Sequence, residues 1–156
     1  MTTNENFAFA KAEMLIRKPV SEVFEAFVNP EITTKFWFTK GSARLEAGKQ
    51  VQWIWEMYNF TAMVSVKAIP SEKIIIEWGE NEDRTTVEWT FKQLDADSTF
   101  VSIVNGDFTG EPQKIISQIR DSTEGFTLVL AGLKAYLEHH IQLNLVGDRF
   151  PTGLAG

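Results

Sequence analysis

The chain has 156 residues, of which 44% are apolar and 12% aromatic, enough for one domain with a substantial core. Its net charge of −6 argues against a nucleic-acid partner, because phosphates attract basic surfaces. The absence of cysteine excludes disulfides, thiolate catalysis and cysteine-ligated metal or cluster sites.

The apolar runs and the beginning of the chain indicate the cellular compartment of the protein. Residues 1–11 are polar and then alternating, without the basic and apolar regions of a signal peptide. No apolar run approaches the roughly 20 residues needed to cross a bilayer. We therefore expect a cytoplasmic protein without a membrane span.

The first part of the chain predicts a strand followed by two short helices. Residues 7–17 alternate between apolar and polar, as a strand does. Apolar residues from Val20 to Val28 follow the three-and-four spacing of an amphipathic helix. A second helix is expected to begin with Asn29 as its cap and Pro30 in its first turn. It would carry three apolar side chains: Ile32, Phe36 and Trp37.

After these helices the period of the pattern changes to two. Alternating apolar residues in the stretches 51–57, 60–68, 74–78, 85–91 and 99–105 predict consecutive strands joined by short turns. Strands connected in this way form an antiparallel meander with one buried face.

The longest predicted element is a helix that begins soon after Pro112. At about 1.5 Å per residue it is long enough to cross a whole small domain. Residues 7–141 are expected to form the core of a single domain spanning 1–156, and residues 142–156 a tail with a loose end. The apolar stripe of the helix recurs at intervals of three and four: Ile119, Thr123, Phe126, Leu130, Leu133, Leu137 and Ile141.

This order of elements predicts an α+β fold. A curved antiparallel sheet of about six or seven strands would be closed by the long helix lying across its concave face. Such a closure leaves a space between sheet and helix, which is either filled by side chains or left as a cavity.

Tryptophan is the residue type that most favours a cavity. Trp53, Trp55, Trp78 and Trp89 share the predicted inward face of neighbouring strands. Each combines a large apolar surface with one N–H group, which suits a pocket for an apolar ligand. Any one of them is more readily a core residue than a ligand contact, but together they favour a ligand site. The candidate ligand-binding residues are Phe36, Trp37, Trp53, Trp55, Trp78, Trp89, Asn105, Phe126, Leu130 and Leu133.

Four residues bear further on this hypothesis. Asn105 is polar on an otherwise apolar strand face, where it either fixes a ligand's carbonyl or hydroxyl or satisfies a neighbouring backbone group. Gly125 and Gly132 each cost roughly 1 kcal/mol against alanine within a helix. That cost would be offset either by close approach of a strand, which is the favoured explanation, or by room for a ligand. Phe126 is expected to face both the sheet and the ligand, with Gly125 bringing the helix close to the sheet.

No catalytic or metal-binding motif is found. Residues 95–97 begin like a calcium loop but lack the required glycine and closing glutamate. His139 and His140 point about 100° apart on a helix and do not chelate one metal together; surface capping is their expected role. Glu56 and Glu77, the candidates for acid–base chemistry, fall on the outward strand face. We therefore predict no catalytic residue, metal or cofactor.

Four segments of the chain resemble a known superfamily. They are residues 19–31, the pair Phe36-Trp37, the strand 85–89 and the helix 122–138. Together they are similar to the START/SRPBCC superfamily, and within it to the branch named for homologues of the activator of heat-shock-protein ATPase. That branch often has Gly-Trp where this chain has Gly125-Phe126, and a histidine where it has Asn105.

The resemblance implies a helix-grip fold, with a curved sheet around a C-terminal helix. It does not select a function, because the superfamily includes lipid carriers, polyketide cyclases, hormone receptors and co-chaperone domains. The leading hypothesis is binding of a hydrophobic small molecule, lipid-like or polycyclic. The alternatives are a cyclase or hydrolase acting on an apolar substrate and, by resemblance only, a chaperone-interacting module. Homodimerisation is left open.

Overall fold

The computed structural model describes residues 8–151 of the chain, and none of its helices within that range is long and apolar enough to cross a membrane. Phe7, in the predicted first strand, and residues 152–156 of the predicted tail lie outside the described range. The elements in chain order are β1 (Ala10–Ile16), α1 (Val20–Val28), α2 (Pro30–Thr33), β2 (Lys40–Gly41), β3 (Gln50–Trp55), η2 (Glu56–Tyr58), β4 (Phe60–Ala68), β5 (Lys73–Trp78), η3 (Asn81–Asp83), β6 (Thr85–Asp95), β7 (Ser98–Gly106), α3 (Pro112–His139) and α4 (Leu145–Arg149).

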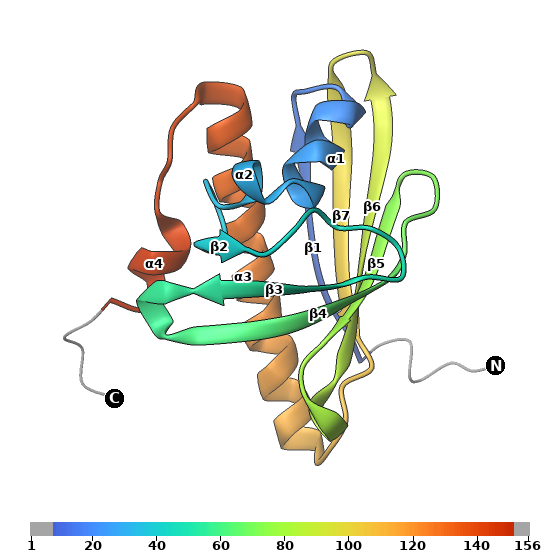
Figure 1. Cartoon of the computed structure of the whole chain (residues 1–156), viewed down its shortest axis with the longest axis vertical. Helices are drawn as coiled ribbons and strands as arrows, with labels where there is room; N and C mark the ends of the chain where they lie inside the picture. Colours follow the sequence, from blue (N-terminus) through green and yellow to red (C-terminus); the bar gives the residue numbers. More distant parts are fainter. Residues whose placement is uncertain (1–7, 152–156) are drawn as a thin grey trace.

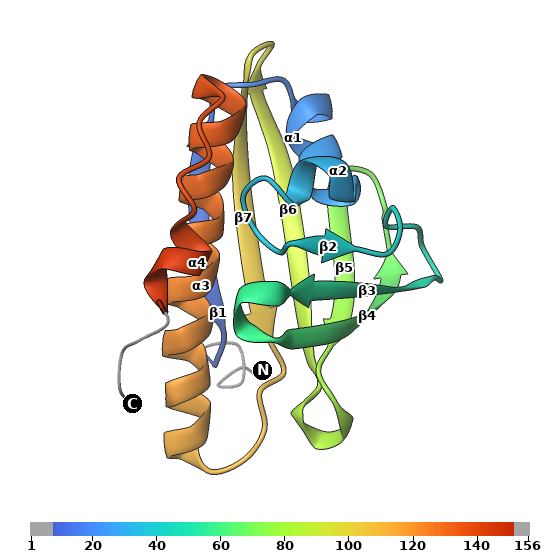
Figure 2. The same ribbon diagram turned by 60° about the vertical axis from the view of Figure 1, so that its left-hand side comes forward.

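The strands form a seven-stranded antiparallel sheet in the order β1-β7-β6-β5-β4-β3-β2. The sheet curls strongly, so that β3 and β4 run across the direction of β6 and β7 (Figure 1). Helix α3 extends along the length of the molecule beside β1, with which it makes close contacts (Figure 2). This arrangement confirms the predicted α+β fold and the meander that follows the short helices.

The period-two pattern places one face of each strand in the core. In β6, for example, Thr85, Val87, Trp89 and Phe91 are buried on one side of the strand. Two details differ from the sequence prediction. Residue 57 does not continue β3, because the chain turns through η2 after Trp55. Phe60, at the start of β4, is 56% exposed.

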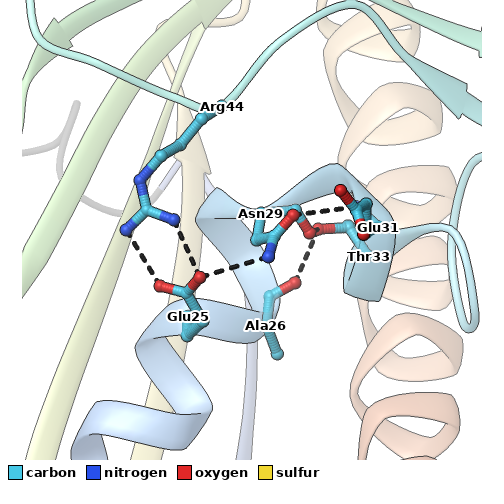
Figure 3. Close-up of polar contacts among 6 residues, drawn as sticks. All are labelled: Glu25, Ala26, Asn29, Glu31, Thr33 and Arg44. Atoms are coloured by element: carbon cyan, nitrogen blue, oxygen red, sulfur yellow. Dashed lines mark hydrogen bonds and ion pairs between the residues drawn. The ribbon is translucent and has the colours of Figure 1, made fainter.

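A polar corner joins α1 to α2 (Figure 3). The Asn29 side-chain oxygen accepts a hydrogen bond from the Glu31 N–H at 3.0 Å, so Asn29 caps α2 as predicted. Its amide nitrogen donates to Glu25 at 3.2 Å, and Arg44 donates to both oxygens of the same carboxylate at 2.8 and 2.9 Å. The hydroxyl of Thr33, fully buried, lies 2.6 Å from the Ala26 carbonyl oxygen, to which it donates.

This corner determines where the chain goes after α2. The helix ends at Thr33, so Phe36 and Trp37 do not lie on it as the sequence predicted. They lie in the turn that follows α2, and both side chains are buried in the core. A four-residue helix is too short to carry them, and backbone hydrogen bonds from Phe36 and Trp37 to the Thr33 carbonyl hold the turn instead.

The C-terminal region also departs from prediction. Helix α3 ends at His139, and His140 takes the left-handed conformation (φ 58°) that closes the helix. Ile141 therefore lies beyond the apolar stripe and is 51% exposed. The described part of the predicted tail forms α4, which contacts α3 (Figure 2).

The Glu25–Arg44 pair makes stability depend on pH. The hydrogen bonds and charge of Arg44 hold the pKa of Glu25 below its ordinary value of 4.5. The pair therefore stabilises the fold above about pH 4.5, and this contribution is lost as pH falls through the folded-state pKa. In Glu25→Gln we expect the loss of unfolding free energy between about pH 7 and pH 3 to be smaller than in the wild type, by at most about 1 kcal/mol because both side chains are more than a third exposed.

Urea unfolding at a series of pH values measures this difference. Glu72→Gln is the control, because Glu72 is exposed in the β4–β5 turn and makes no ion pair among the described residues. Identical acid dependence of wild type and Glu25→Gln would show that the pair contributes nothing.

Candidate ligand-binding cavity

A cavity of about 900 Å³ lies between the concave face of the sheet and α3. Its volume is in the range of sites that enclose small organic ligands. Residues of the strands, of the turn after α2, of α3 and of α4 contribute to its wall, among them Trp37, Trp55, Trp78, Phe126, Val129 and Val146.

The cavity opens where the sheet is incomplete. Strand β5 begins to pair with β4 only at Val64, opposite Trp78, so the first residues of β4 extend past the end of β5. Val66 hydrogen-bonds through its backbone to the segment leading into β3. Alternation along the strand therefore turns the N–H and C=O groups of Thr61 and Met63 away from β3, toward the opening. No strand within residues 8–151 pairs with them on that side.

Five of the candidate residues line this cavity: Trp37, Trp55, Trp78, Asn105 and Phe126. The rings of the four aromatic residues among them form one group of neighbouring rings. The Phe126 ring centroid lies 5.6 Å from that of Trp37 and 5.9 Å from that of Trp78, on which it stacks. Phe126 therefore faces the tryptophan-bearing strands and the cavity at the same time.

The other candidates lie behind this wall. Trp53 stacks on Phe38 at 4.7 Å, and Trp89, Leu130 and Leu133 are at most 1% exposed in the packed core. Phe36 does not line the main cavity. It borders a smaller one of about 210 Å³ next to the α3–α4 connection.

The two glycines of α3 have opposite environments. A Cβ atom added at Gly125 would meet nothing within 4 Å, because this position faces the cavity. The expectation that Gly125 brings the helix close to the sheet is therefore wrong. A Cβ atom at Gly132 would lie 3.2 Å from the Phe36 Cβ and 3.3 Å from the Phe36 carbonyl oxygen, so this glycine is closely packed, but against the turn after α2 and not against a strand as expected.

The C-terminal segment, expected to be a loose tail, contributes to the cavity wall. The Tyr58 hydroxyl donates to the Val146 carbonyl oxygen, and its ring lies 5.9 Å from that of Phe150. Arg149 donates to Glu124 of α3 at 2.8 Å and covers the Phe150 ring at 4.2 Å. The apolar residues at 145, 146 and 150 were the available signal, because a solvated tail has no need of them.

Charged groups of the cavity wall are at its rim. Asp83 accepts a hydrogen bond from Lys114 at 2.7 Å, and both side chains are about half exposed. Burial raises the pKa of the Tyr58 hydroxyl. The hydrogen bond to Glu124 raises the pKa of Arg149, which stays cationic beside the opening.

Acid–base candidates named from the sequence lie elsewhere. Glu56 lies in η2 and not on a strand face as expected, and it is paired with Lys40 at 3.3 Å. Glu77, in β5, is paired with Lys67 and Arg84 at 3.8 and 3.5 Å. Within the described range no cluster of histidine, cysteine or carboxylate side chains has the arrangement to hold a metal ion.

Asn105 is satisfied by its neighbours. It is 3% exposed, and its amide nitrogen donates to the Thr86 carbonyl at 2.9 Å and to the Thr85 hydroxyl at 3.0 Å. Its oxygen accepts from Ser122 of α3 at 2.8 Å. The bond to the Thr86 carbonyl is the backbone role considered for Asn105, and because both amide hydrogens are used in this way, none is left to donate to a ligand carbonyl.

A curled sheet gripping one long helix, with a cavity between them, is the arrangement that the sequence resemblance implied. A search with family models gives a match to "Activator of Hsp90 ATPase homolog 1-like protein" over residues 17–138. The chain belongs to this family. It is thereby a member of the corresponding branch of the START/SRPBCC superfamily.

Solved structures show the same fold. Protein SSP2350 from Staphylococcus saprophyticus is 29% identical, with a TM-score of 0.75 over 86% of this chain and 95% of that one. The Aha1 dimer from Colwellia psychrerythraea is 15% identical (TM-score 0.69, 84% and 96%). The di-domain ARO/CYC BexL from the BE-7585A biosynthetic pathway is 12% identical (TM-score 0.73), with 83% of this chain matching 46% of that one. A search among curated proteins found no match.

The contrast between the glycines predicts opposite effects of the same substitution. Gly125→Ala should raise the free energy of unfolding by about 0.5–1 kcal/mol, because alanine favours a helix and meets no neighbour. Gly132→Ala should lower it, because displacing Phe36 costs about 1–3 kcal/mol. Denaturant midpoints of both variants check this, and equal effects would contradict the assigned environments.

Truncation of Phe126 tests whether this residue belongs to the cavity wall or to the packed core. Phe126→Ala should cost less than about 3 kcal/mol, the lower end for phenylalanine truncation, because Phe126 borders the cavity and the space that its ring leaves joins one that is already open. Phe91→Ala, at a site 0% exposed and packed on Phe24 and Phe27, should cost about 3–5 kcal/mol. Equal losses, measured by denaturant unfolding, would mean that Phe126 is an ordinary core residue.

Proposed function

We propose that this protein binds a hydrophobic small molecule, lipid-like or polycyclic, in the cavity between its sheet and α3. The observation that carries the proposal is the unfilled space of about 900 Å³ walled by the rings of Trp37, Trp55, Trp78 and Phe126. An open space of this size beside aromatic rings suits an apolar ligand.

The energetics favour an apolar ligand. The cavity opens to solvent beside Thr61 and Met63, so a ligand can enter it from water. Moving apolar ligand surface from water onto the tryptophan faces gains roughly 25 cal/mol for each Å² buried. Flat ring systems add stacking with indole rings, which supports the polycyclic alternative.

The fold comparison is compatible with such ligands. One structural neighbour is described as a di-domain ARO/CYC of a biosynthetic pathway, and at 12% identity the likeness concerns the fold. Acid–base chemistry on a bound substrate has less support, since the carboxylates of the described cavity wall are exposed residues at its rim.

A cavity-filling substitution provides a direct test. Gly125→Leu places a side chain into the space that a Cβ at this position would enter unopposed. We expect it to weaken binding of polycyclic and fatty-acid probes by about tenfold or more, equivalent to about 1.4 kcal/mol, without loss of stability. Titrations followed by tryptophan fluorescence and amide NMR shifts measure this affinity.

Thr127→Leu is the matched control, because Thr127 is exposed on the same helix and does not line the cavity. It should bind the probes like the wild type. The proposal fails if no probe perturbs the cavity residues, or if both leucine variants bind as the wild type does.

A further inference from the structure

One end of the cavity carries a chain of polar side chains from four elements. They are Trp78 at the end of β5, Thr85 at the start of β6, Asn105 near the end of β7 and Ser122 in α3. The end of β5, the start of β6 and the end of β7 lie toward the lower end of the molecule in Figure 1, and Ser122 lies in the first half of α3. All four residues belong to the cavity wall, and Thr85 is 7% exposed.

The direction of each hydrogen bond in this chain follows from chemistry. The Thr86 carbonyl can only accept, so the Asn105 group that faces it at 2.9 Å is the NH₂ and not the oxygen. The second hydrogen of that NH₂ is then donated to the Thr85 hydroxyl at 3.0 Å. The Trp78 indole N–H, which can only donate, reaches the same hydroxyl oxygen at 3.1 Å.

Two incoming donors occupy both lone pairs of the Thr85 oxygen. Its own proton must therefore be donated, in the one remaining tetrahedral direction. The hydrogen bonds of the described residues include no acceptor for it. Ser122 is complementary: its proton goes to the Asn105 oxygen at 2.8 Å, which leaves the lone pairs of the Ser122 oxygen free to accept.

We infer that this polar end selects apolar ligands that carry a carbonyl oxygen, which accepts the proton of Thr85, while the adjacent Ser122 oxygen accepts from a neighbouring ligand hydroxyl or amine. This inference rests on the proposed function and names the ligand class for the same cavity. A buried hydroxyl proton without an acceptor is costly, so a ligand lacking a carbonyl would displace water from Thr85 without replacing its hydrogen bond.

Matched ligand pairs test the inference without knowledge of the natural ligand. Fluorene and fluorenone, or tetralin and alpha-tetralone, differ by one carbonyl oxygen on the same ring system. Dissociation constants are measured for each pair with wild type and Thr85→Val, which has the same shape without the hydroxyl. The preference for the ketone over its hydrocarbon should fall by about 3- to 10-fold in Thr85→Val, the worth of one hydrogen bond.

Two further variants keep the result interpretable. Thr86→Val is the control, because the Thr86 hydroxyl donates to Asp107 and does not line the cavity; its ketone preference should equal that of the wild type. Thr85→Ser keeps the hydroxyl and should retain the preference for the ketone. This variant can be measured even if Thr85→Val does not fold because Trp78 and Asn105 have lost their acceptor. Loss of the ketone preference in Thr85→Ser would overturn the inference.

The outcomes separate the two proposals. If both members of a pair bind and the ketone preference is the same in wild type and Thr85→Val, the role of Thr85 is wrong while the apolar cavity site stands. If neither member of any pair binds the wild type, the proposed function fails and the inference with it. A preference that falls in Thr85→Val and survives in Thr85→Ser and Thr86→Val supports both.

Discussion

The position of the Trp37 ring is the constraint on which the rest of the molecule depends. The ring lies between sheet and helix, with centroids of Trp53, Trp78, Trp89 and Phe126 at 4.9, 6.1, 6.1 and 5.6 Å. On one side of it the interior is packed solid, and on the other side the large cavity begins. The ring also borders the smaller cavity, so it separates the two spaces. It keeps this place because the α1–α2 corner ends the helix at Thr33 and directs the next turn inward.

The cavity opens to solvent because neighbouring strands of the sheet end at different points. Strand β5 stops at Trp78 while β4 continues to Phe60, which leaves an opening that side chains of the sheet do not close. Helix α4 lies at this opening, held to Tyr58 on one side and to Glu124 on the other. The wall is therefore assembled from segments far apart in sequence, and each contributes only a few side chains.

Membership of the family establishes the fold but does not select a ligand, because unrelated activities share this architecture. Selectivity must come from the groups that face the cavity. In this chain they include several indole and phenyl rings, charged residues at the rim and one short hydrogen-bonded chain at one end. The rings favour apolar ligands without distinguishing among them, whereas the direction of the hydrogen bonds gives the polar end a defined donor and acceptor.

The sequence by itself determined the elements, because periodicity is a local property. Alternation along residues 85–91 places Trp89 inward whatever lies opposite, and the three-and-four stripe places Phe126 toward the sheet. Only the tertiary structure decided which inward residues border empty space. Trp53 and Trp55 are equivalent by alternation, and Phe38 contacts both, yet Trp53 is 1% exposed beneath a stacked Phe38 ring while Trp55 lines the cavity. Gly125 and Gly132 have the same local context in α3, but Phe36 approaches only the second. Packing against partners distant in the chain distinguishes such pairs, and no local pattern encodes it.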